Sequence, residues 1–191
     1  NSGTINAYGY FDYAYGVEAR AYGDGSTLAI DNSGVVNAES HYYNAVGLQG
    51  TVGQDATTLD ITNSGTVDVT AYYSAIGIKA NGNGLGDTTV DSSGSISATS
   101  YDSYADGIYA FSLSQDVYVS NSGVIDADGQ YGAAGIFAYT HYSNATGTVN
   151  VDNSGTINAY GYDGDAYGIL AVSTTPGNVY VNNSGNVDAK G

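Results

Sequence analysis

Residues 1–7 read NSGTINA, and residues 153–159 repeat the same seven letters. The opening Asn-Ser-Gly triplet, replaced once by Ser-Ser-Gly, returns along the chain at intervals of 29 to 32 residues. Regular spacing of this length is typical of repeat proteins, in which a unit can bury its apolar face only against its neighbours. The repeats begin at residues 1, 32, 63, 92, 121, 153 and 183, which makes six full units and the start of a seventh.

Each repeat contains three short segments in which apolar residues, many of them β-branched, alternate with polar ones. In the first repeat these segments fall at residues 4–7, 14–19 and 28–30. Alternation with a period of two predicts β-strands, and the stretches rich in Gly, Ser, Asn and Asp predict the turns between them. We therefore expect one all-β domain over residues 1–191, a parallel β-solenoid with about 30 residues and three strands of about five residues in each coil. A right-handed winding is expected by analogy with parallel crossover connections.

Aliphatic side chains recur at equivalent positions of the repeats, and we expect them to point inward as three columns that form the core. The first strands contribute Ile5, Val36, Val67, Ile96, Ile125, Ile157 and Val187. The second strands contribute Val17, Leu48, Ile78, Ile108, Ile136 and Ile169. The third strands contribute Ile30, Ile61, Val90, Val119, Val151 and Val181.

The Asn of the triplet should stack at one corner of the solenoid. Stacked side-chain amides can donate to the coil on one side and accept from the coil on the other, as in Asn ladders of cross-β structures. The expected structural ladder consists of Asn1, Asn32, Asn63, Asn121, Asn153 and Asn183.

Composition excludes several classes of protein. Only three residues are Lys or Arg, against 19 Asp or Glu, and the net charge of −16 argues against nucleic acid and anionic membranes as partners. The chain has no Cys, which excludes a disulfide scaffold and thiolate metal sites. No run of 18 apolar residues occurs, so we expect no membrane insertion of this segment.

The phrase Asn-Ser-Gly-Thr-Ile at residues 153–157 is followed half a repeat later by Gly168-Ile169. This arrangement resembles the β-solenoid passenger and stalk repeats of bacterial autotransporters and related type V secreted adhesins. The resemblance covers the whole chain, and the missing Cys fits it. It implies a stalk at the surface of a Gram-negative bacterium, hence an extracellular or cell-surface location. The abundance of Tyr, 20 residues, departs from the usual repeat.

No catalytic or metal constellation stands out, so we expect neither an enzyme nor a required cofactor. Asp126 and Asp128 fall on one strand face, but with 17 Asp such carboxylate pairs arise by chance. His41 and His141 are expected at different corners. Residues 163–168 resemble the start of a calcium loop without its distal Glu, and incidental Ca²⁺ at this loop is the alternative to a metal-free protein.

Tyrosine is the residue that bears most on function, because 14 of the 20 fall between the first and second strands of a coil. One interpretation is a stacked ladder of rings that stabilises the solenoid. The other is an aromatic surface that grips sugars or a neighbouring solenoid, with a second apolar strip on the outward side of the second strands. The candidate contact or glycan-stacking residues are Tyr42, Tyr43, Tyr72, Tyr73, Tyr101, Tyr104, Tyr109 and Phe137.

The pattern as a whole predicts a structural protein, either a stalk segment of a surface adhesin or a subunit of an extracellular filament. The expected partner is the solenoid itself, through end-to-end association or continuation of the same coil. Two alternatives remain open: a carbohydrate-binding module that uses the Tyr-rich corner for cell-surface glycans, and a segment of a phage tail fibre.

Overall fold

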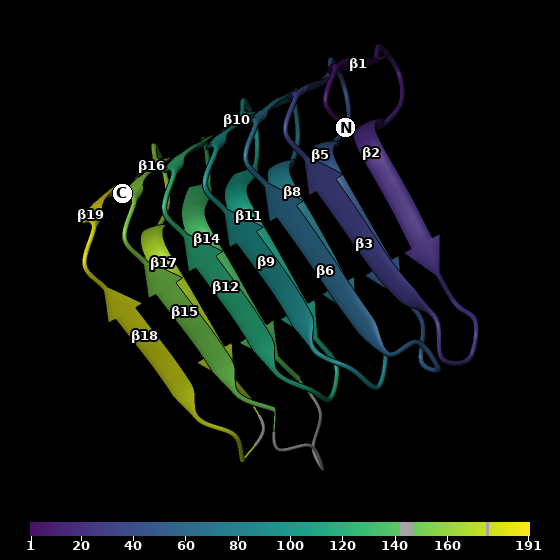
Figure 1. Ribbon diagram of the computed structural model, residues 1–191. Helices are drawn as coiled ribbons and strands as arrows, with labels where there is room; N and C mark the ends of the chain where they lie inside the picture. Colours follow the sequence, from purple (N-terminus) through teal and green to yellow (C-terminus); the bar gives the residue numbers. More distant parts are fainter. Residues whose placement is uncertain (142–146, 175) are drawn as a thin grey trace.

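The computed structural model describes residues 1–141, 147–174 and 176–191. It confirms an all-β parallel β-solenoid with three strands in each coil. Figure 1 shows the coils stacked along one axis, with the N-terminus at one end of the stack and the C-terminus at the other. Strands from successive coils pair in parallel, so that every third strand of the chain joins the same sheet.

Each of the three sheets collects one of the predicted segments. The first sheet contains β1 (Thr4–Gly9), β4 (Val35–Ser40), β7 (Thr66–Ala71), β10 (Ser95–Ser100), β13 (Val124–Gly129), β16 (Thr156–Gly161) and β19 (Asn186–Lys190). The second contains β2 (Ala14–Ala21), β5 (Ala45–Val52), β8 (Ala75–Gly82), β11 (Tyr104–Ser112), β14 (Gly132–Thr140) and β17 (Ala166–Ser173). The third contains β3 (Thr27–Asn32), β6 (Thr58–Asn63), β9 (Thr88–Ser92), β12 (Val117–Asn121), β15 (Val149–Asn153) and β18 (Val179–Asn183).

The predicted inward columns form in the predicted register. Ile96 pairs with Val67 on one side and with Ile125 on the other. Ile108 lies between Ile78 and Ile136 in the same way. All three sheets contribute to one continuous core, and the central members of each column are fully buried.

The second strands are longer than the predicted five residues, because each extends to eight or nine. Their alternation of inward and outward positions is interrupted at the same place in every coil, where a Gly stands two residues after an Ala. These glycines are Gly16, Gly47, Gly77, Gly107, Gly135 and Gly168. A Cβ added at Gly107 would lie 2.2 Å from Cγ2 of Ile125, in the core. Gly107 and Ile108 therefore both face inward, and only a residue without a side chain fits the first of these positions.

The Asn-Ser-Gly corner holds the expected amide ladder. Nδ2 of Asn32 donates to Oδ1 of Asn63 at 2.8 Å, and Nδ2 of Asn121 donates to Oδ1 of Asn153 at 2.7 Å. Asn1 and Asn183 continue the ladder at its two ends. Ser92 replaces Asn in the fourth coil, so the chain of direct amide contacts is interrupted there.

The glycine of the triplet allows successive coils to approach closely at this corner. A Cβ at Gly34 would lie 2.0 Å from the carbonyl oxygen of Gly3, which no side chain could tolerate. The backbone amide of Val35 donates to that same oxygen at 2.9 Å, so the close approach is part of the ladder between coils. In the described part of the chain no helix is both long and apolar enough to cross a membrane.

Both terminal coils leave one edge of each sheet without a neighbouring strand among the described residues. β1, β2 and β3 pair only with the second coil, while β17, β18 and β19 pair only with the coil before them. The core is correspondingly open at these ends, where Val181 is 49% exposed and Val187 is 41% exposed. Residues at equivalent positions in the middle of the stack are fully buried.

Candidate ligand-binding surface

The outward side of the second sheet changes character along the solenoid. One column of outward residues starts with charged and polar side chains and ends with apolar ones. We call the outward side of β2, β5 and β8 the polar half, and that of β11, β14 and β17 the aromatic half. The column runs through Glu18, Gln49, Lys79, Tyr109, Phe137 and Leu170.

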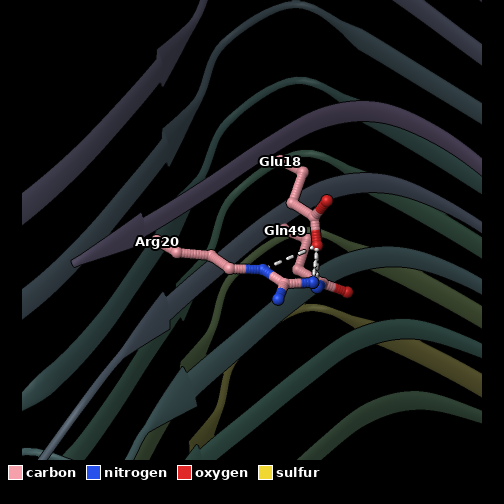
Figure 2. A network of polar contacts seen from close by, with 3 residues as sticks. All are labelled: Glu18, Arg20 and Gln49. Atoms are coloured by element: carbon pink, nitrogen blue, oxygen red, sulfur yellow. Dashed lines mark hydrogen bonds and ion pairs between the residues drawn. The ribbon is translucent and has the colours of Figure 1, made fainter. Parts of the chain in front are cut away.

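The polar half contains a small hydrogen-bonded network (Figure 2). Nε of Arg20 donates to Oε1 of Glu18 at 3.0 Å, and the guanidinium forms an ion pair with the same oxygen. Nε2 of Gln49, from the neighbouring strand, donates to this oxygen at 2.9 Å. The charges of this region are therefore compensated within the protein.

The aromatic half is a cluster of packed rings. The ring of Tyr109 lies edge-on to Phe137, with centroids 5.5 Å apart, and Phe111 packs against Tyr139 at 4.7 Å. The hydroxyl of Tyr109 donates to that of Tyr139 at 3.2 Å. Burial among these rings raises the pKa of Tyr109 strongly. Lys79 borders the cluster, with Nζ 5.9 Å from the centroid of the Tyr109 ring.

A pocket of about 480 Å³ lies beside the aromatic half. Its walls come from the first and middle residues of β11, β14 and β17 and from the bends that precede β14 and β17, which places four aromatic rings and two carboxyl groups around one space. The lining residues are Tyr104, Asp106, Tyr131, Ala133, Ala134, Phe137, Gly164, Asp165, Tyr167 and Leu170.

Asp106 is the half-buried acid of this pocket. Burial raises the pKa of its carboxyl to about 6, and the positive charge of Lys79 opposes this rise only in part. Burial also lowers the pKa of Lys79. Within the described residues, the carboxylate of Asp106 accepts no hydrogen bond and forms no ion pair.

The predicted Tyr corner is continuous only in the first three coils. Tyr42 contacts Tyr10 at 5.4 Å between ring centroids and Tyr72 at 6.4 Å. Tyr72 lies edge-on to Tyr73, and Tyr43 packs against Tyr13. Beyond these coils, no ring pair at this corner is found in the described part of the chain.

The predicted contact residues therefore separate into two places. Tyr42, Tyr72 and Tyr101 line a second pocket of about 510 Å³, together with His41. Tyr104 and Phe137 belong instead to the pocket beside the aromatic half, and Tyr109 lies in the ring cluster next to it.

The weaker chemical candidates have ordinary partners. Asp126 accepts a hydrogen bond from Nδ2 of Asn158 at 2.6 Å, and its charge together with burial raises the pKa of Asp128. The ring of His41 stacks on Tyr10, whereas His141 bonds to the hydroxyl of Thr174 at 3.0 Å.

The loop considered for calcium holds two carboxylates that already have donors. Gln130 donates to Asp163, and the hydroxyl of Tyr167 donates to Asp165 at 3.1 Å. Across residues 1–141, 147–174 and 176–191, no group of three or more His, Asp or Glu side chains is placed to hold a metal ion.

Sequence reasoning did not single out Asp106, Phe111 or Tyr139. Phe111 and Tyr139 each follow a predicted apolar outward residue by two positions, so the period of two would have placed them on the same face. Asp106 precedes the Gly at which the alternation is interrupted. Tyr104, on the same strand, lines the same pocket, but the other lining residues come from the next two coils. No local sequence signal marks Asp106.

Comparison with protein-family models, with curated proteins and with solved structures finds no match to this chain.

Proposed function

We propose that this chain is a structural, extracellular β-solenoid, either a stalk segment of a bacterial surface adhesin or a subunit of an extracellular filament. The observation that carries the proposal is the set of three parallel sheets, each of which stays in register from coil to coil along the whole stack. An open parallel edge presents unpaired N–H and C=O groups that a further coil would satisfy. The repeated inward columns supply the same apolar contacts at every step.

A further coil fits the ends without a change of geometry. The strand β19 has the same spacing from the Asn-Ser-Gly triplet as β1 and begins a seventh coil, so the next strand positions to fill are those over β17 in the second sheet and over β18 in the third. The exposed Val181 and Val187 would then become buried like their equivalents in the middle coils. Burial of apolar surface of this kind stabilises association by about 25 cal/mol for each Å².

Electron microscopy and fibre diffraction of the purified chain test the proposal. We expect rods or fibres whose axial repeat equals the coil spacing of about 4.8 Å. A tandem chain, in which residues 1–182 are followed by residues 1–191, should form a rod about twice as long in small-angle scattering. A chain that stays monomeric at high concentration, together with a tandem that folds as two separate bodies, would contradict the proposal.

Glycan binding at the Tyr corner is a second candidate function, because Tyr42, Tyr72 and Tyr101 line one pocket of about 510 Å³. Exposed rings around a hollow provide apolar faces on which a sugar ring can stack. A glycan array tests this candidate, with Tyr72→Ala as the variant that should lose binding. Equal signals from the wild-type chain and from this variant would remove it.

A further inference from the structure

The pocket beside the aromatic half carries negative charge, and it belongs to a chain whose net charge is also strongly negative. Asp106 and Asp165 both line it, and the chain carries a net charge of −16. Aromatic rings add to this field, because the faces of their π-systems are negative. The lining contains no Lys, Arg or His.

Asp106 lacks the compensation that other acids of this surface have. Glu18 has Arg20 and Gln49 as donors, and Asp165 accepts from the hydroxyl of Tyr167. The carboxylate of Asp106 is half-buried without a hydrogen bond in the described part of the chain. A partly desolvated carboxylate is stabilised by a nearby positive charge. Lys79 supplies this charge only in part, so a cationic ligand would add to its effect.

The aromatic and aliphatic walls of the pocket favour a cation that is surrounded by apolar groups. A primary ammonium carries three N–H donors that must all find acceptors, and Asp165 already accepts from Tyr167, so the acceptors left for it are Asp106 and the tyrosine hydroxyls. A quaternary ammonium carries no donor and presents methyl groups to the rings. A neutral sugar would leave the charge of Asp106 uncompensated.

We propose that this pocket binds a quaternary ammonium group, which lies against the rings of Tyr104, Tyr131 and Phe137 and beside the carboxylate of Asp106. The site does not need the proposed filament, because all of its lining residues belong to one chain. Tyr167 and Leu170 lie on β17, the last strand of the second sheet, so one side of the pocket is formed by the last coil. It would give a structural solenoid one specific binding site on its outward surface.

Titration calorimetry of the full chain with choline tests the proposal. The comparison ligand is the neutral isostere of choline, in which carbon replaces the nitrogen and the shape is unchanged. Cation–π and charge–charge attraction should make choline bind roughly tenfold more tightly than the isostere. Two further ligands complete the comparison. Nα-acetyl-lysine amide, whose side-chain amine is free, represents a primary ammonium, and a methyl glucoside represents a neutral sugar. Both should bind more weakly than choline.

Two variants localise the interaction. Asp106→Asn keeps the shape of the side chain and removes its charge, so the affinity for choline should fall roughly tenfold while the affinity for the isostere stays the same. Asp60→Asn is the matched control, because Asp60 is exposed on β6 of the third sheet and is remote from the pocket. This control should leave both affinities unchanged.

The pH dependence of the wild-type chain gives a test that needs no variant. The titratable groups that face Asp106 are Lys79 on β8, Tyr109 on its own strand and, across the pocket, Asp165 and the tyrosines. With a carboxyl pKa of about 6, the affinity for choline should rise as pH increases through that value. The proposal is overturned if choline and its isostere bind alike, if the glucoside binds more tightly, or if the affinity for choline neither falls in Asp106→Asn nor changes across this pH range.

Discussion

The polar half and the aromatic half of the second sheet have the same interior and different exteriors. Leu48, in the polar half, and Ile108, in the aromatic half, occupy equivalent inward positions and are both fully buried. One strand position further, the outward residues are Gln49 and Tyr109, a polar amide and a larger aromatic ring. The inward positions determine that coils can stack, whereas the outward positions are free to vary and can carry binding.

The two halves also treat charge differently. In the polar half, the carboxylate of Glu18 has donors from its own strand and from the neighbouring one. In the aromatic half, rings replace those donors, and Asp106 is left without a hydrogen bond in the described part of the chain. The same backbone therefore supports a compensated carboxylate in one half and a carboxylate without a hydrogen-bond donor among the described residues in the other.

The largest effect should come from a charge placed in the shared interior. Leu48→Asp and Ile108→Asp each bury an unpaired carboxylate, which costs several kcal/mol and should lower the free energy of unfolding by similar amounts in the two halves. Chemical denaturation measures both variants. Thr51→Asp is the control, because Thr51 faces outward beside Arg20 and should tolerate the charge. An unchanged denaturation midpoint for either core variant would show that its column does not face inward.

A smaller effect should follow when a side chain is truncated on each outward half. Phe137→Ala removes a ring that packs against Tyr109 and Tyr139, and should cost about 1–2 kcal/mol. Gln49→Ala removes one hydrogen bond to Glu18 and should cost about 1 kcal/mol or less. Denaturation midpoints compare the two, with Phe137→Leu as the variant that keeps apolar volume. A larger loss for Gln49→Ala would mean that the ring cluster contributes little to stability.

The charge of Asp106 predicts an effect that depends on pH. Its folded pKa of about 6 lies above the ordinary value of 3.8, so the folded chain holds this proton more tightly than the unfolded chain does. That stabilisation is present at low pH and is lost as pH rises through about 6. Asp106→Asn should therefore be more stable than the wild-type chain near pH 8, by on the order of 1 kcal/mol for this half-buried group.

Thermal unfolding at several pH values tests this expectation. The gain of Asp106→Asn should shrink towards about pH 4, where the wild-type carboxyl is itself protonated in the folded chain. Asp60→Asn, on the exposed side of β6, should show no comparable change with pH. A variant that is no more stable than the wild-type chain near pH 8 would mean that Asp106 is well solvated or well paired.

The architecture could be predicted from the sequence because its causes are local and repeated. An Asn-Ser-Gly triplet every 29 to 32 residues sets the corner, and Ile or Val at alternating positions sets the inward columns. Each coil repeats the same pattern, so the neighbouring coils predict the register of an irregular segment such as Thr88-Thr89-Val90, in which Thr88 stands where other coils have Leu or Val. The structure pairs Val90 with Ile61 and Val119, as the columns predict.

The candidate site could be predicted only in part, because its residues are brought together across coils. Tyr104 and Phe137 were candidates because they are aromatic and because the pattern placed Tyr104 at the corner before a second strand and Phe137 on the outward side of one. No pattern marked Asp106. The interrupted alternation at Gly107 places Asp106 and Tyr109 on the same side although they are three residues apart. The surroundings of an outward residue that is not repeated from coil to coil depend on the side chains of the neighbouring coils. Those contacts cannot be read from the pattern of a single repeat.

The smallest effect should come from the ion pair of the polar half. Arg20→Ala removes the guanidinium that bonds to Glu18, but the Arg20 side chain is 51% exposed, and exposed pairs contribute little because water and salt screen them. Glu18 also keeps its hydrogen bond from Gln49, so its carboxylate is not left without a donor. The melting temperature of this variant should equal that of the wild-type chain at both low and high salt. A marked drop in melting temperature that disappears at high salt would contradict this expectation. It would show that the outward residues of the polar half also contribute to stability, so that the two halves differ only in the kind of interaction that they use.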